Sequence, residues 1–205
     1  MAILGTVQIV TDNFNRANQN PISGNWTDAG GAVFQILSNV VDVVTQSSDS
    51  HAIWNTWASG NDQYSQAEIT VGSASAGSGL GVCVRANSNV AINTLYRLYI
   101  GNDGAWAIDR ILTGTVVTIR SGTTTYAAGT ALGLLIIGST LQAYYGGVAI
   151  GASIVDANIS SGFPGIAYSS TITSRTLDNW DAGIPVLGFR KNPLKPYPFK
   201  PGLRR

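Results

Sequence analysis

The chain has very few of the residues on which most catalytic and metal sites depend. Its 205 residues include one cysteine, Cys83, one histidine, His51, and one glutamate, Glu68. A single cysteine excludes an intrachain disulfide, a cysteine zinc cluster and a dithiol redox pair. A single histidine without a Gly-x-Ser-x-Gly segment provides no basis for a serine hydrolase. We predict a packed thiol at Cys83 and a surface histidine at His51.

Lysine is absent from the first 183 residues, which carry six arginines against eleven acidic residues, a formal charge of −5. Residues 184–205 hold all three lysines, three arginines and no acidic residue, a formal charge of +6. The sequence has no run of about 18 apolar residues, so we expect no membrane span. The first residues lack the basic region and apolar core of a signal peptide.

The body is rich in glycine, serine, threonine, alanine, valine and isoleucine, a composition typical of β-structure. Short apolar runs bounded by turn residues predict about fourteen antiparallel strands. They are expected near 4–10, 32–37, 39–45, 51–56, 63–72, 79–86, 94–101, 104–111, 114–120, 131–138, 140–145, 148–154, 164–169 and 174–181. Hairpin turns are predicted at 101–104, 113–114 and 145–147. This number of strands exceeds a seven-stranded immunoglobulin-type sandwich and favours a larger two-sheet jelly roll.

Alternation along the central strands assigns side chains to the two faces of a sheet. Tyr96, Leu98 and Ile100 share the face expected to form the core. The opposite face is predicted to carry Arg85, Arg97, Tyr99 and Asp109, beside the small side chains of Ala105 and Ala107. These four residues are our candidate carbohydrate-binding residues, above a shallow floor, because sugar binding needs an aromatic surface and a few fixed polar groups.

Several short segments, in a fixed order, carry a resemblance to a known fold family. They are Asp12-Asn-Phe-Asn-Arg16, Gly24-Asn-Trp26, Leu80-Gly-Val-Cys-Val-Arg85, Tyr96-Arg-Leu-Tyr-Ile100, Gly162-Phe-Pro-Gly-Ile166 and Leu177-Asp-Asn-Trp-Asp-Ala-Gly183. Over roughly residues 8–183 the chain resembles the concanavalin A-like (laminin G-like) jelly-roll domains of phage and bacterial surface proteins. The resemblance implies an all-β, two-sheet antiparallel sandwich with adjacent N- and C-terminal strands. We predict one such domain at 1–183 and an extended arm at 184–205.

This fold hosts lectins, glycosidases, adhesion modules and virion proteins, so it implies no single function. Glucanases of the family use paired glutamates on one concave strand, whereas Glu68 has no second acid nearby. We therefore predict that the protein is not an enzyme. Related jelly rolls often hold a structural calcium ion, and the fold would bring Asp12, Asp178 and Asp181 together. Their spacing favours turn or capping roles, so we expect no metal and no cofactor.

The arm contains five prolines, which exclude a helix and disfavour a central strand. It alternates apolar anchors with cations, a pattern suited to docking in a protein groove more than to tracking phosphates. The predicted partner-binding residues are Phe189, Arg190, Lys191, Leu194, Lys195, Tyr197, Phe199, Lys200, Arg204 and Arg205. The leading hypothesis is a structural or display protein of a phage-like virion or extracellular assembly, bound through this arm to other subunits or to copies of itself. The alternative is a lectin-like carbohydrate-binding module that recognises surface glycans.

Overall fold

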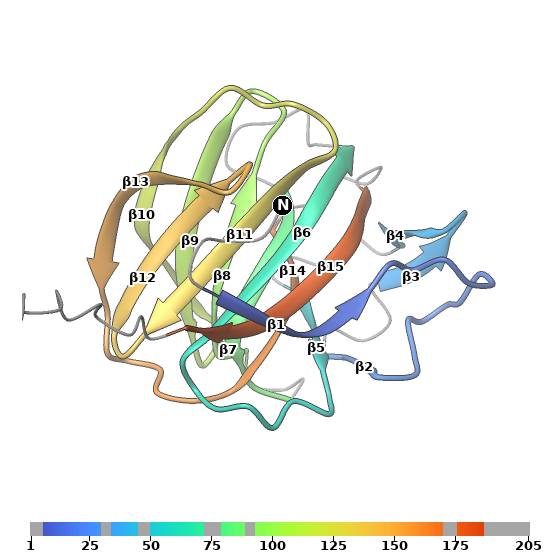
Figure 1. Ribbon diagram of the computed structural model, residues 1–205, viewed down its shortest axis with the longest axis horizontal. Helices are drawn as coiled ribbons and strands as arrows, with labels where there is room; N and C mark the ends of the chain where they lie inside the picture. The colour runs from blue at the N-terminus through green and yellow to red at the C-terminus, as the bar shows by residue number, and fades with distance from the viewer. Residues whose placement is uncertain are drawn as a thin grey trace, which may run out of the picture.

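The computed structural model describes residues 6–29, 34–44, 50–71, 79–88, 93–169 and 176–186, which form an antiparallel β-sandwich (Figure 1). The strands are β1 (Thr6–Asp12), β2 (Trp26–Asp28), β3 (Phe34–Leu37), β4 (Val40–Val43), β5 (Ser50–Trp54), β6 (Gln63–Val71), β7 (Gly79–Ala86), β8 (Leu95–Ile100), β9 (Ala105–Leu112), β10 (Thr115–Thr123), β11 (Thr130–Ile137), β12 (Thr140–Tyr145), β13 (Val148–Val155), β14 (Phe163–Ser169) and β15 (Thr176–Pro185). Within this part of the chain no helix has the length and apolar character needed to cross a bilayer.

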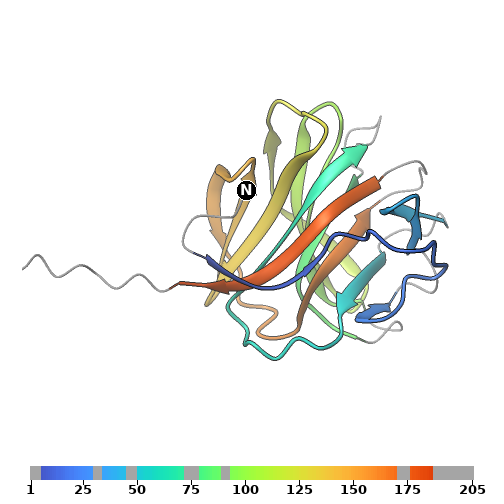
Figure 2. The same cartoon turned by 45° about the vertical axis from the view of Figure 1, so that its right-hand side comes forward.

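The two sheets are stacked as layers, as Figures 1 and 2 show from two directions. One sheet has eight strands in the order β13-β12-β11-β6-β15-β4-β3, with β1 paired to β15 beside β4. The other has seven strands in the order β10-β9-β8-β7-β14-β5-β2. The pairing of β1 with β15 confirms that the first and last strands of the jelly roll lie side by side.

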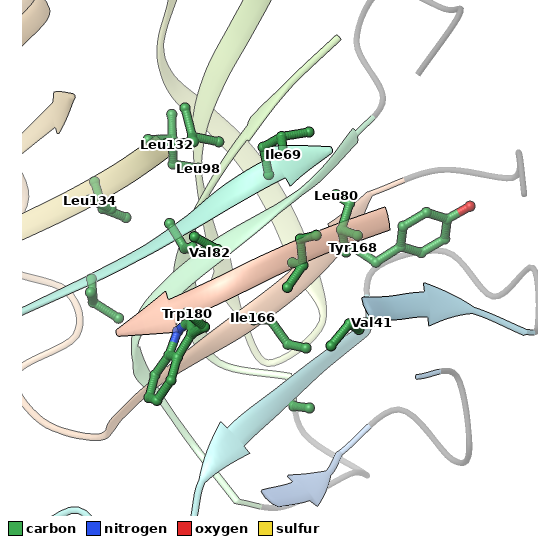
Figure 3. Packing of buried hydrophobic residues seen from close by; sticks show 14 of the residues in the cluster. Val41, Ile69, Leu80, Val82, Leu98, Leu132, Leu134, Ile166, Tyr168 and Trp180 are labelled. Carbon is green, nitrogen blue, oxygen red and sulfur yellow. The ribbon is translucent and has the colours of Figure 1, made fainter. Parts of the chain in front are cut away.

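The core lies between the sheets and is built from the apolar positions of each alternating strand. Figure 3 shows Ile69, Leu132 and Leu134 of the eight-stranded sheet close to Leu80, Val82, Leu98 and Ile166 of the seven-stranded sheet. Tyr96, Leu98 and Ile100 are fully buried there, which confirms the face predicted from their spacing. Truncating such a side chain removes its transfer energy and leaves a cavity, at a typical cost of about 2–5 kcal/mol.

All fourteen predicted strands overlap an observed strand, and only the three-residue β2 was missed. The predicted hairpins are confirmed by left-handed backbone at their turns, where Gly104, Gly114, Gly146 and Gly147 all have φ between 60° and 81°. Strand β15 continues to Pro185, two residues past the predicted domain boundary. Residues 187–205, and with them every arm residue predicted to bind a partner, lie outside the described residues.

The closing segment of the resemblance has a structural explanation in β15. A bulge between Asp178 and Asp181 places Asn179 at φ 48° and adds one residue to the strand. Leu177 and Trp180 consequently both face the core although they are three residues apart, and ordinary alternation after the bulge returns Ala182 to the core. Gly183 follows because a Cβ at this position would lie 1.8 Å from the carbonyl oxygen of Val7 on β1. The motif therefore specifies how β15 packs against both neighbours.

Candidate functional site

The outer face of the seven-stranded sheet brings together three of the four candidate carbohydrate-binding residues. On β8 and β9, Arg97 lies directly opposite Asp109, and Tyr99 lies opposite Ala107. Directly paired residues of antiparallel strands project from the same face, so the candidates Arg97, Tyr99 and Asp109 share one surface with Ala107. The alternation of the sequence correctly predicted this arrangement for β8 and β9.

Arg97 and Asp109 form a buried ion pair rather than an open polar surface. Nε and Nη2 of Arg97 donate to Oδ2 of Asp109 at 3.0 and 2.8 Å, and the side chains are only 3% and 2% exposed. The other carboxylate oxygen accepts a 2.7 Å hydrogen bond from Thr118 on β10, and Nη1 of Arg97 donates to the carbonyl of Tyr168. Both ions are thus held by several partners, the condition under which a buried pair is tolerated.

A depression of about 410 Å³ lies next to this pair on the same face. It is lined by Tyr99, Ala105, Trp106, Ala107, Thr118, Ser121, Gly122 and Thr123. The small side chains of Ala105 and Ala107 belong to it, as the predicted shallow floor required. Tyr99 is only 6% exposed, and the guanidinium carbon of Arg97 lies 5.5 Å from its ring centroid. The tyrosine therefore presents an edge to the depression rather than a broad platform.

The side chain of Trp106 points away from this depression and into the core between the sheets, because Trp106 pairs with the core residue Ile100 across β9 and β8. Its ring packs between β10 and β13 of the other sheet: a Cβ at Gly122 would lie 2.8 Å from its Cζ2 atom, and a Cβ at Gly151 would lie 2.7 Å from its Cη2 atom. The indole is almost fully buried, and its Nε1 has no acceptor among the described residues. A buried donor without an acceptor is destabilising, and this one is enclosed in the core, out of reach of a ligand in the depression.

Arg85 does not share this face, which corrects the expectation drawn from simple alternation. It has φ 50°, and the pairing of β7 with β14 shifts register beside it. Its guanidinium instead donates to three backbone carbonyls, those of Asn61, Ile159 and Gly138, at 2.6–3.0 Å. The positive φ at this bulge turns the side chain toward loops at one end of the sandwich, where its role is structural.

Comparison with solved structures gives this fold a name. No protein-family model and no curated protein matches the sequence. The carbohydrate-binding module CBM66 from Bacillus subtilis is similar at TM-score 0.57 and 17% identity, over 77% of this chain and 95% of that one. An endo-β-1,3-glucanase from Pyrococcus furiosus is similar at TM-score 0.62 and 10% identity, over 89% and 96%. The exoplasmic/lumenal domain of VIP36, in a Ca²⁺/Man-bound form, is similar at TM-score 0.55 and 8% identity, over 78% and 83%.

These structures are concanavalin A-like jelly-roll sandwiches. The fold of this chain is the concanavalin A-like jelly roll. Identities of 8–17% are too low to carry more than the fold. The function must therefore be argued from the side chains of this particular jelly roll.

Among the described residues no three His, Cys, Asp or Glu side chains come together in a group that could hold a metal ion. Glu68 lies on β6 in the eight-stranded sheet and accepts a hydrogen bond from Asn179. The expectation that Glu68 has no second acid nearby was wrong, because Asp178 lies directly opposite it on β15. Burial, together with the negative charge of Glu68, raises the pKa of Asp178. Burial also raises the pKa of Asp181, whose Oδ2 accepts from Gln66. Neither sheet face in the described chain presents two acids across a cleft.

The histidine and the cysteine are both buried on the outer side of the seven-stranded sheet. Cys83 is fully buried, which confirms the packed thiol, and burial raises its pKa. The prediction of a surface position for His51 was wrong: it is fully buried, and its Nε2 lies 2.8 Å from the carbonyl oxygen of Asn87. Burial lowers the pKa of His51 and favours the neutral ring. Its position at the start of a strand concealed the contact with the segment after β7.

The opening motif of the jelly roll builds a polar cluster that the sequence analysis used only as a sign of the fold. Oδ1 of Asp12 accepts hydrogen bonds from the Phe14 amide and from Nη1 of Arg16, at 2.8 and 2.6 Å. Its Oδ2 accepts from Nε1 of Trp26 at 2.8 Å. Trp26 in turn packs edge-on against Trp54 and Trp180. The spacing of these residues allows one carboxylate to join the first strand to the aromatic part of the core.

Proposed function

We propose that this protein binds carbohydrate, without hydrolysing it, in the depression on the outer face of β8–β10. The observation that carries the proposal is the lining of that depression: small apolar residues at its floor, the edge of Tyr99, and the hydroxyls of Thr118, Ser121 and Thr123. A sugar has apolar ring faces and a rim of hydroxyls, and therefore needs this combination of surfaces.

Each part of the depression has a separate task in this proposal. Ala105 and Ala107 leave room for a sugar ring, which packs its C–H groups against the edge of Tyr99. Ser121 and Thr123 are exposed and exchange hydrogen bonds with sugar hydroxyls. Arg97 and Asp109 are positioning residues, because they are buried and Asp109 holds Thr118 in place.

The absence of hydrolysis is proposed from the carboxylate nearest the depression. Asp109 is buried, and both of its oxygens already accept hydrogen bonds from Arg97 and Thr118. A glycosidase needs two carboxyl groups that flank the scissile bond, about 5–10 Å apart, one able to donate a proton. Asp109 is ion-paired and has no such partner among the described residues that line the depression.

The similar solved structures include a carbohydrate-binding module, a mannose-bound lumenal domain and a glucanase, which supports carbohydrate as the ligand class. No comparison supports a role in a virion. Binding of a partner through the arm, and the location in a virion or extracellular assembly, stay predictions from the sequence.

A glycan array, supplemented with soluble β-1,3-glucan and mannosylated glycans, tests the proposal with wild type and two variants. Ala105→Leu fills the floor and is expected to weaken binding about tenfold or more, equivalent to about 1.4 kcal/mol. Ala149→Leu is the matched control, since it adds the same atoms to exposed β13 of the other sheet. Silence of the folded wild type on every glycan, or equal affinities of the two variants, would refute the proposal.

The hydroxyl groups at the rim of the depression and the absence of hydrolysis are tested in separate experiments. Ser121→Ala with Thr123→Ala is expected to weaken the same glycan while leaving thermal stability unchanged, since both residues are exposed. A reducing-sugar assay on any glycan that binds should show no release above the buffer rate. Steady turnover that survives purification would show that the protein is a hydrolase and not a binding module.

A further inference from the structure

A second hollow, of about 340 Å³, lies at the rim of the sandwich, where β1 ends and the chain leads to β2. It is lined by Thr11, Asp12, Arg16, Gln19, Ser23, Gly24, Asn25 and Trp54. It shares no lining residue with the depression on β8–β10. Its volume falls in the range of small-molecule sites, about 300–1,000 Å³.

The acceptors of this hollow are already occupied by the protein. Both oxygens of Asp12 accept hydrogen bonds from Phe14, Arg16 and Trp26. The side-chain oxygen of Gln19 accepts from Nε of Arg16 at 3.4 Å. The charge of Asp12 is matched by the ion pair with Arg16, so the site has little capacity left to accept hydrogen bonds from a ligand.

Its donors, by contrast, are only partly used. Trp54 is 7% exposed, and its Nε1 has no acceptor among the described residues. Arg16 uses Nη1 and Nε within the protein, whereas its Nη2 makes no hydrogen bond to the described chain and its side chain is 32% exposed. The side-chain amide of Asn25 is exposed at the same hollow. Arg16 and Asn25 therefore give the hollow exposed N–H groups, one of them cationic, and the indole N–H of Trp54 is buried without an acceptor in a residue that lines it.

We propose that this hollow binds the carboxylate of a small acidic ligand of the size of an acidic monosaccharide. Arg16 donates to the carboxylate through Nη2, and Trp54 and Asn25 supply neutral donors. A guanidinium suits a carboxylate because its N–H groups lie in one plane with the geometry of the two oxygens. The ion pair with Asp12 holds Arg16 in position, which reduces the side-chain entropy lost on binding. This site does not depend on the proposed function of the depression.

The test is a titration of the ¹⁵N-labelled protein with sodium galacturonate, followed through the indole N–H signals at constant ionic strength. Trp54→Phe identifies the Trp54 signal by its disappearance. We expect this signal to shift saturably with galacturonate and not with galactose, which lacks the carboxylate. A shift with sodium acetate at the same signal supports the carboxylate as the recognised group. Equal shifts with galactose, or no saturable shift with galacturonate, would overturn the proposal.

Variants show which side chains hold the carboxylate. Arg16→Gln removes the cation and is expected to weaken galacturonate about tenfold or more. Arg120→Gln is the matched control, because it removes another partly exposed arginine, on β10, that donates to a backbone carbonyl. Unchanged affinity in a folded Arg16→Gln protein contradicts the proposal.

Asn25→Ala provides a second test that does not disturb the ion pair, since the fold uses only the backbone carbonyl of Asn25. It must also weaken galacturonate binding, and an affinity equal to wild type would count against the site. Ala105→Leu is expected to leave this affinity unchanged. The rim site and the glycan depression can therefore fail independently.

Discussion

The Arg97–Asp109 pair and the Arg16–Asp12 pair use the same two side chains in very different surroundings. The first lies between strands on the outer face of the seven-stranded sheet, and its members are 3% and 2% exposed. The second lies at the rim of the sandwich, and its members are 32% and 10% exposed. Burial converts the first pair into a structural support beneath a depression. Partial exposure leaves the second with unused donors that face solvent.

The comparison teaches that the number of hydrogen-bond donors left unused, rather than the presence of charge, decides whether such a pair can bind a ligand. Every carboxylate oxygen of both aspartates accepts a hydrogen bond. The arginines differ, because Arg97 is enclosed whereas Arg16 keeps Nη2 without a hydrogen bond to the described chain. A ligand at the rim is consequently expected to contact Arg16 directly. A ligand in the depression is expected to contact residues that the Arg97–Asp109 pair holds in place, and not Arg97 itself.

The largest effect is expected for Arg97→Ala, which leaves the Asp109 carboxylate buried without its counterion. Such a change typically costs about 3–5 kcal/mol of unfolding free energy. Urea denaturation at neutral pH measures it. The double variant Arg97→Met with Asp109→Leu should lose clearly less, because neither ion is then stranded. If single and double variants are equally destabilised, desolvation of the unpaired charge is not the cause.

A smaller effect is expected for Asp12→Ala at the rim. Three donors lose their acceptor, the Phe14 amide, Nε1 of Trp26 and Nη1 of Arg16. Since two of these donors belong to buried residues, we expect a loss of about 1–3 kcal/mol, again by urea denaturation. Asp12→Asn retains one carbonyl acceptor and should be intermediate. A loss as large as that of Arg97→Ala would contradict the difference in burial between the two pairs.

The smallest stability effect is expected for Arg16→Gln, which removes the partly exposed cation but leaves Asp12 with two donors. Partly exposed pairs contribute about 0–1 kcal/mol and are screened by salt. Thermal unfolding in low salt and in about 1 M salt should show a small cost that shrinks further at the higher ionic strength. The cost of Arg97→Ala should change little with salt. Equal salt dependence of the two variants would contradict the difference in solvent exposure between the two ion pairs.

Much of the fold was predictable because the relevant physics is local. Alternation placed Tyr96, Leu98 and Ile100 in the core, and glycines at 101–104 and 113–114 predicted hairpins that the structure contains. The predicted surface of Arg97, Tyr99 and Asp109 also exists, because a strand period of two residues determines which side chains share a face. The missed strand β2 has only three residues, too few for a periodic pattern.

The candidate site was less predictable because it depends on contacts between distant strands. Alternation cannot reveal a positive φ, so it assigned Arg85 to the wrong surface. It also cannot give burial, which reassigned Arg97 and Asp109 from contact residues to support, and enclosed His51 beside Asn87. The hollow beside Arg16 joins residues 11–25 to Trp54, a proximity that no sequence pattern indicates.

The sequence by itself determined the all-β class, the strands, the core faces and the opposite charges of body and arm. Composition, strand periodicity and turn chemistry act over a few residues, so they can be read along the chain. The tertiary structure alone decided which polar groups are enclosed and which keep unused donors. That outcome depends on the stacking of two sheets and the pairing of β1 with β15, across more than 160 residues.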